Sequence, residues 1–86
     1  MDISSIRVLV VEDHEPFRRF LISTLQKTWE VRNIHEASNG LEGVQAAQRL
    51  QPDLILLDIG LPKLNGIEAA RRIRKLSPTS KIIFVT

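Results

Sequence analysis

Acidic residues stand directly after apolar segments of this chain. Glu12 and Asp13 follow the segment Arg7 to Val11, and Asp58 follows the segment Asp53 to Leu57. Clustered carboxylates repel one another unless a hard cation neutralises them, and Mg²⁺ accepts carboxylate oxygens together with water and a phosphate oxygen. Taken singly, each acidic residue is as well explained by capping a helix or facing water as by binding a metal. The three together predict a Mg²⁺ site, provided that the fold brings them to one place.

The surrounding segments predict an α/β fold with a parallel sheet. Continuous branched apolar runs suit strands that are buried on both faces, and segments of helical period separate these runs. The expected strands are Arg7 to Val11, Val31 to Ala37, Asp53 to Leu57 and Lys81 to Val85. The carboxyl ends of parallel strands share one edge, where ligands bind. Glu12, Asp13, Asp58 and Thr86 are therefore expected at that edge.

Three helices are expected between the strands. Pro16 suits the first position of a helix, and Asn39 and Asn65 each stand three residues ahead of a glutamate, as in a capping box. In the first helix the expected buried arc consists of Phe17, Phe20, Leu21, Thr24 and Leu25. Ile22 falls off this arc, and Arg18 and Arg19 fall on the opposite, solvent-facing side.

Composition excludes several classes of protein. Hydrophobic residues make up 43% of the 86 residues, so one domain with a packed core is expected. There is no cysteine and the net charge is only +2, which argues against a thiolate metal site and against direct contact with nucleic acid. No apolar run approaches the roughly 20 residues of a membrane span, and no secretory signal pattern opens the chain. We therefore expect a cytoplasmic protein.

Three segments resemble the receiver domains of two-component response regulators, the CheY-like superfamily. The first is Val8 to His14 with its acidic pair, the second is Leu56 to Gly66 with Asp58, Pro62 and Gly66 at spacings of four, and the third is Ile82 to Thr86. The stretch 65–74 is similar to regulators of the LuxR or FixJ type.

The resemblance implies a flavodoxin-like, doubly wound sheet with strand order 2-1-3-4. It also implies that residues 1–86 form a receiver domain that is incomplete at its C-terminus. The fifth strand, a lysine that follows it and the last two helices of the family would be missing. Lys81 to Thr86 would then be an exposed edge, and such an edge can template pairing. We therefore expect a homodimer or a strand-swapped form of the fragment.

The resemblance also implies a role for each candidate residue. Asp58 would be the phosphoacceptor for a sensor histidine kinase, and the Thr86 hydroxyl would contact the phosphoryl group and switch the domain. Asp13, Asp58 and the Gly60 carbonyl would bind Mg²⁺ directly, with Glu12 acting through a water. The protein would be regulatory rather than an enzyme, and a C-terminal helix-turn-helix domain would bind DNA.

Two alternatives to this interpretation remain open at the level of sequence. One is a free-standing receiver without a DNA-binding output domain. The other is a Mg²⁺-dependent phosphohydrolase of the haloacid dehalogenase type, but that family needs a second Asp two residues after the nucleophile, where Gly60 stands. A nucleotide-binding module is not supported, because neither glycine-rich phosphate-binding motif is present.

Overall fold

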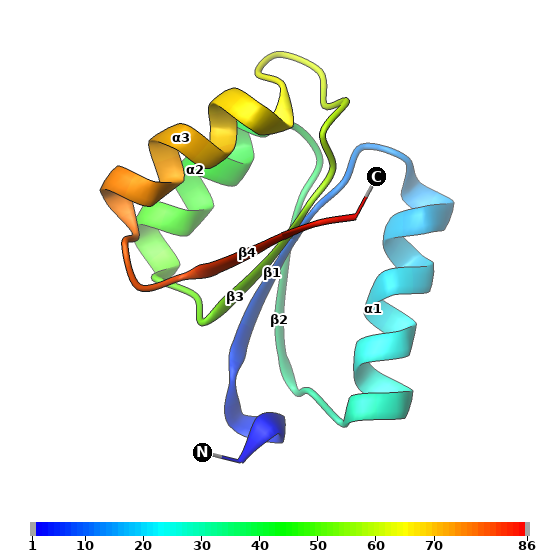
Figure 1. Ribbon diagram of the computed structural model, residues 1–86. Helices are drawn as coiled ribbons and strands as arrows, with labels where there is room; N and C mark the ends of the chain where they lie inside the picture. The colour runs from blue at the N-terminus through cyan, green and yellow to red at the C-terminus, as the bar shows by residue number, and fades with distance from the viewer. Residues whose placement is uncertain (1, 86) are drawn as a thin grey trace.

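The computed structural model, which describes residues 2–85, contains one four-stranded parallel sheet of order β2-β1-β3-β4 (Figure 1). The strands are β1 (Arg7–Val11), β2 (Asn33–Ala37), β3 (Leu54–Leu57) and β4 (Lys81–Phe84). The helices are α1 (Glu15–Trp29), α2 (Gly40–Leu50) and α3 (Gly66–Leu76), and a short 3-10 helix spans Ile3–Ser5. The predicted fold class and strand order are confirmed.

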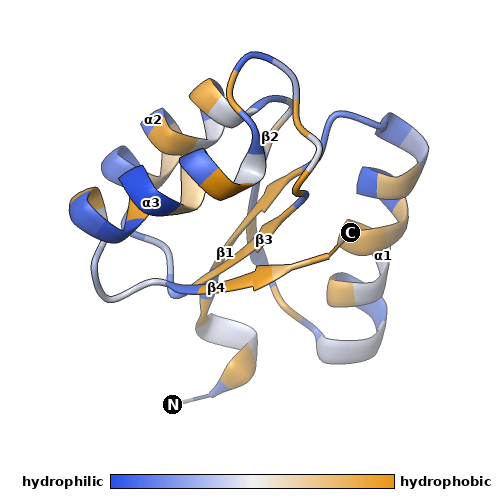
Figure 2. Cartoon of the chain, turned by 45° about the horizontal axis from the view of Figure 1, so that its top comes forward, coloured by the Kyte–Doolittle hydropathy of each residue, from blue (hydrophilic) through white to orange (hydrophobic). Residues whose placement is uncertain are grey.

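Helices cover both faces of the sheet (Figures 1 and 2). On one face α2 and α3 pack against side chains such as Leu9, Val11 and Leu57, which are fully buried. On the other face α1 packs against Val8 and Val10 through Ile22. Because β1 lies between two strands and under helices on both sides, four consecutive apolar residues of this strand are buried.

The two asparagine caps are confirmed. Asn39 accepts a hydrogen bond from the Glu42 main-chain N–H (2.8 Å), and Asn65 accepts one from the Glu68 N–H (3.0 Å). The glutamates differ, since the Glu42 carboxylate accepts the Ser38 N–H whereas Glu68 forms ion pairs with the arginines at positions 71 and 72.

The prediction for the buried side of α1 was wrong in part. The helix begins at Glu15, one residue before Pro16, and its buried residue is Ile22, which the expected arc excluded. Phe20 is 62% exposed and stacks on Phe17 with a ring separation of 6.2 Å. Leu21 and Leu25 of the expected arc do pack beside Ile22, so the buried face is rotated away from Phe20 and toward Ile22.

Within residues 2–85, no helix is long and apolar enough to cross a membrane.

Candidate functional site

Three carboxylates from two loops meet at the carboxyl end of the sheet. One oxygen each from Glu12, Asp13 and Asp58 lies within 4.8 Å of the others. The parallel register of β1 with β3 pairs Val11 with Leu57, so the residues that follow each strand emerge side by side. The convergence expected from the sequence is confirmed for these three residues.

Glu12, in the loop after β1, is held by hydrogen bonds at its main-chain N–H, its carboxylate and its main-chain carbonyl. Its main-chain N–H donates to the Ala37 carbonyl of β2 (3.0 Å), and its carboxylate accepts the His14 N–H (2.9 Å). Its main-chain carbonyl accepts a hydrogen bond from Nη1 of Arg18 (2.9 Å). Glu12 is only 2% exposed, whereas its neighbour Asp13 faces solvent.

Burial raises the pKa of Glu12 above its ordinary value. Desolvation is the largest cause, and the negative charge of Asp58 and hydrogen bonds with Asp13 and Asp58 raise the pKa further. The His14 N–H opposes this shift because it stabilises the ionised carboxylate. The site therefore concentrates more negative charge than its own hydrogen bonds neutralise, which is the condition that favours a bound cation.

The loop after β3 is fixed by close backbone contacts. The Gly60 N–H donates to Oδ1 of Asp58 (3.1 Å), and the Gly66 N–H donates to the Ile59 carbonyl (2.7 Å). A Cβ at position 66 would overlap the Asp58 carbonyl oxygen, so only glycine allows α3 to start directly beneath the loop. Position 60 is different, because a Cβ there would meet no atom within 4 Å.

The peptide unit between Leu57 and Asp58 is hydrogen-bonded at both ends. The Leu57 carbonyl accepts from the Val85 N–H, and the Asp58 N–H donates to the Val11 carbonyl, each at 3.1 Å. This unit therefore joins the end of β4 to the end of β1. Thr86, the expected phosphoryl contact and switch residue, lies outside the described residues.

Arg18 is a residue of this region that the sequence analysis had placed on the solvent-facing side. Its side chain is only 12% exposed, and besides the Glu12 carbonyl it reaches Glu36 of β2, with Nε 2.8 Å from Oε1. One signal pointed to this contact, since a cation in the first turn of a helix is opposed by the helix dipole and needs acidic partners.

The sequence as a whole matches one family model. The description of that family is response regulator receiver domain, and the match covers residues 8–86. The chain belongs to this family. It is therefore a signal-transduction module of two-component systems, and its role is regulatory.

Curated relatives carry this receiver domain in proteins of different kinds. The chain is 47% identical over 78 residues to a protein-glutamate methylesterase/protein-glutamine glutaminase of Colwellia psychrerythraea, covering 91% of the chain and 21% of that protein. It is 42% identical over 81 residues to the transcriptional regulatory protein LiaR of Bacillus subtilis, covering 94% of the chain and 38% of that protein. The chain thus spans well under half the length of these relatives.

Solved structures of receiver domains superpose closely on the chain. The response regulator domain of Thermotoga maritima CheB has a TM-score of 0.86 at 39% identity, covering 93% of this chain and 59% of that one. The receiver domain of the Pseudomonas aeruginosa histidine kinase PA1611 has a TM-score of 0.81 at 31% identity, covering 95% and 67%, and was solved with a magnesium ion in its active-site cleft.

Proposed function

We propose that residues 1–86 act as a Mg²⁺-dependent phosphoacceptor, with Asp58 taking a phosphoryl group from a sensor histidine kinase. The observation that carries this proposal is the convergence of Asp58 with Glu12 and Asp13. Family membership adds the two-component context. Among the three carboxylates, the resemblance to the receiver family assigns the phosphoacceptor role to Asp58, and the Gly60 N–H orients its carboxylate.

The donor set fits Mg²⁺. Asp13 and Asp58 offer carboxylate oxygens, the Gly60 carbonyl is the proposed third protein ligand, and Glu12 acts through a water. Burial, and after it the negative charge of Asp58, raise the pKa of Glu12, and a bound divalent cation would oppose both by stabilising the ionised carboxylate. When bound, Mg²⁺ neutralises charge on the transferring phosphoryl oxygens. A site with few carboxylates and room for water and phosphate is the kind that this ion prefers.

In the proposed step, one Asp58 carboxylate oxygen forms a bond to phosphorus as the phosphorus–nitrogen bond of a kinase phosphohistidine breaks. The imidazole leaves with the bonding electron pair and takes up a proton, and an acyl phosphate remains on Asp58. We propose that the Thr86 hydroxyl then donates a hydrogen bond to a phosphoryl oxygen. Because the product stays on the protein, the output is a changed conformation.

The test is incorporation of phosphate from a small phosphodonor in the presence of Mg²⁺, followed by intact mass. The unmodified protein is expected to gain one phosphoryl group, and Asp58→Asn to gain none. Asp53→Asn is the matched control, because Asp53 lies at the opposite end of β3, where its carboxylate accepts the Arg7 N–H. Full labelling of Asp58→Asn would contradict the assignment.

The relatives of this chain combine the receiver domain with two kinds of output domain. One is a transcriptional regulator and the other a methylesterase. We propose a DNA-binding helix-turn-helix output, which the likeness of residues 65–74 to LuxR or FixJ regulators favours, in a cytoplasmic protein. Sequence-specific promoter binding by residues 1–86 alone would contradict this division of labour.

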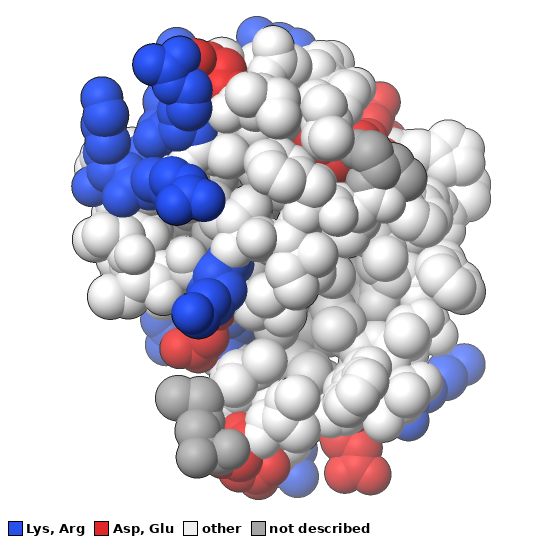
Figure 3. All heavy atoms as spheres, in the orientation of Figure 1, with Lys and Arg blue, Asp and Glu red and all other residues white. Residues whose placement is uncertain are grey.

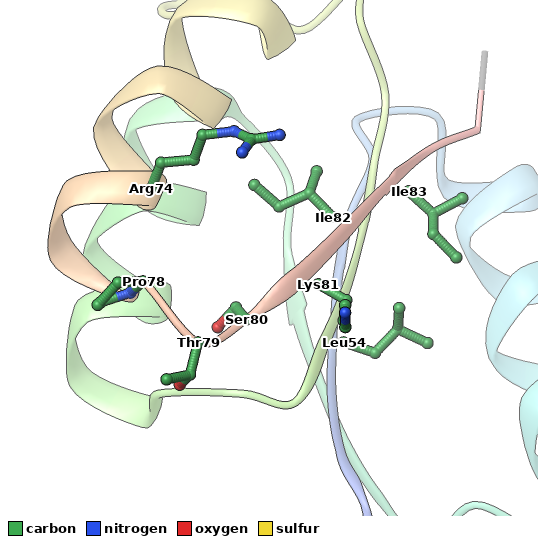
Figure 4. Close-up of a pocket in the computed structure, with 8 residues that line it drawn as sticks. All are labelled: Leu54, Arg74, Pro78, Thr79, Ser80, Lys81, Ile82 and Ile83. Carbon is green, nitrogen blue, oxygen red and sulfur yellow. The ribbon is translucent and has the colours of Figure 1, made fainter.

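We further propose that two copies of this chain pair through β4. This strand is one of the two outer strands of the sheet in the part of the chain that the structure describes. Ile83 and Phe84 are 50% and 42% exposed. Ile82 points toward α3 and Ile83 toward α1 (Figure 4). A hollow of about 580 Å³ lies beside the strand on the α3 side.

The outer edge of β4 also carries unpaired main-chain groups. The N–H groups of Lys81 and Val85 donate inward to β3 and its neighbouring loop, so by strand alternation those of Ile82 and Phe84 point outward. Antiparallel pairing centred on Ile83 places Ile82 of one copy opposite Phe84 of the other. The Lys81 residues of the two copies then lie at opposite ends, and their charges do not meet.

The charge distribution of this face agrees with self-pairing. Lys and Arg gather over α3, whereas the surface in front of β4 is mostly uncharged (Figure 3). A second copy brings the same apolar strand and no carboxylate, which suits this edge better than an acidic partner does. Exposed strands of this kind are templates for further pairing.

Light scattering tests this pairing, and we expect a dimer. Ile83→Lys is expected to give a monomer because two like charges would face each other across the two-fold axis. Asn33→Lys adds the same charge to the other outer strand, β2, and is expected to leave the dimer intact. A monomeric unmodified chain at high concentration, or a dimer of Ile83→Lys, would overturn the proposal.

A further inference from the structure

Arg18 is largely buried although it lies near the N-terminus of a helix that has one side in solvent. It lies in the first turn of α1, where the helix dipole opposes a positive charge. Its side chain is 12% exposed, and its guanidinium bridges two elements: Nε lies 2.8 Å from Oε1 of Glu36, and Nη1 lies 2.9 Å from the main-chain oxygen of Glu12. Nη2 lies 3.8 Å from Oε2 of Glu15, close enough for an ion pair but not for a hydrogen bond.

These contacts place the guanidinium behind the acidic loop. Glu36 belongs to β2 and pairs in register with Val10 of β1, so it is a fixed point of the sheet. Arg18 connects that fixed point to the carbonyl of Glu12, from which the chain turns into Asp13. Two further hydrogen bonds of Glu12 join it to main-chain groups of Ala37 and His14, and Arg18 is the side chain that binds its main-chain carbonyl.

We propose that Arg18 is a positioning residue of the Mg²⁺ site, holding the loop of Glu12 and Asp13 in the orientation that faces Asp58 before a cation binds. This inference rests on the proposed function. The planar guanidinium suits the task because its separated N–H groups reach two acceptors on different elements, whereas a lysine ammonium is a single point of charge.

The sign of the effect on Mg²⁺ affinity separates positioning from simple electrostatics. A positive charge near three carboxylates repels a cation, so removal of Arg18 would strengthen Mg²⁺ binding if charge alone mattered. If Arg18 positions the ligands, its removal weakens binding, because the loop must then be ordered when the cation binds.

The experiment is a calorimetric Mg²⁺ titration of the folded protein and three variants. Arg18→Met is expected to bind Mg²⁺ roughly tenfold more weakly, and Arg18→Lys to lie between it and the unmodified protein. Arg19→Met is the matched control. Arg19 lies 3.4 Å from the same Glu36 oxygen but is 60% exposed, and we expect its replacement to leave the affinity unchanged.

A second measurement needs no metal and keeps the two proposals distinguishable. Amide hydrogen exchange in residues 12–14 is expected to accelerate in Arg18→Met and to stay unchanged in Arg19→Met, relative to the amides of β1 and β3. If Arg18→Met does not fold, Glu36→Leu removes the acceptor that anchors the guanidinium to β2 and provides the same test. Unchanged exchange in these residues, or Mg²⁺ binding by Arg18→Met as tight as in the unmodified protein, would overturn the role of Arg18. Failure of the unmodified protein to bind Mg²⁺ would instead contradict the proposed function.

Discussion

The two loops that form the acidic site are held in place by different physical means. The loop after β1 depends on charge: Arg18 ties the Glu12 carbonyl to Glu36. The loop after β3 depends on steric fit, since Gly66 lies against the Asp58 carbonyl with no room for a side chain. The two loops should therefore respond to different substitutions, although their carboxylates meet in one site.

The same contrast extends to the outer strands behind the loops. Beside β1 lies β2, whose residues Asn33, His35 and Glu36 are polar and whose Glu36 is ion-paired. Beside β3 lies β4, where only Lys81 is charged and Ile83 is half exposed. Charged and polar residues discourage pairing with another strand, and apolar ones allow it. Within the described residues, the polar β2 edge thus disfavours pairing with another strand, whereas the apolar β4 edge allows it.

The largest expected effect is on the sterically fixed loop. Gly66→Ala forces Cβ into the Asp58 carbonyl, so we expect a loss of about 3 kcal/mol or more in the free energy of unfolding, measured with urea. Gly60→Ala is the control in the same loop, and it should change that free energy by less than about 0.5 kcal/mol because the added Cβ meets open space. Equal losses for the two variants would mean that the loop is free to move away from α3.

The next effect concerns the acidic pair after β1. Asp13→Asn should weaken Mg²⁺ binding more than Glu12→Gln, because in the proposed site Asp13 is a direct ligand and Glu12 acts through a water. For Glu12→Gln we expect a loss of roughly 10- to 100-fold, as for other residues that act on a metal through an intermediary. Glu15→Gln removes a nearby exposed charge from outside the cluster and controls for charge alone. A titration in which Glu12→Gln is the more damaging variant would reverse the two roles.

The smallest expected effect is a pH dependence. The pKa of Glu12 is raised above its ordinary value of 4.5, so the folded state holds this proton more tightly than the unfolded state does. Its contribution to the free energy of unfolding is complete below that ordinary value and is lost as the pH rises through the raised pKa. One proton sets a ceiling of about 1.4 kcal/mol per pH unit on the slope.

Urea unfolding between pH 4 and pH 8, without Mg²⁺, measures this slope. Glu12→Gln should remove the Glu12 part of the decline, and saturating Mg²⁺ should remove it in the unmodified protein. An identical decline in the variant would show that another group is responsible.

The sequence correctly predicted most features that follow from the order of residues along the chain. Apolar runs identified the strands, Asn39 and Asn65 identified two helix starts, and residues at strand ends identified the carboxylate cluster. These features are local, or they follow from the parallel order of the strands.

Features that depend on how elements rotate against each other were not predicted correctly. Ile22 was placed off the buried face of α1, and Arg18 was placed in solvent. At the end of the same helix, Trp29 is 53% exposed and borders an apolar hollow of about 270 Å³ that Leu25 of α1 and Leu54 of β3 also line. The rotation of the helix about its axis, which buries Ile22 together with Leu21 and Leu25, is set by the sheet beneath it, and the helix sequence alone does not contain that information.

The peptide unit between Leu57 and Asp58 has a mechanical consequence. A peptide group is planar and stiff, so a tilt imposed at its carbonyl end is transmitted to its nitrogen end. Here the carbonyl is held by Val85 and the nitrogen by Val11. A small displacement of β4 therefore turns the same plane from which the Asp58 side chain extends. If Asp58 is phosphorylated as proposed, thermodynamic reciprocity requires that a ligand of β4 whose affinity depends on the phosphoryl group shift the phosphorylation equilibrium of Asp58 by the same factor.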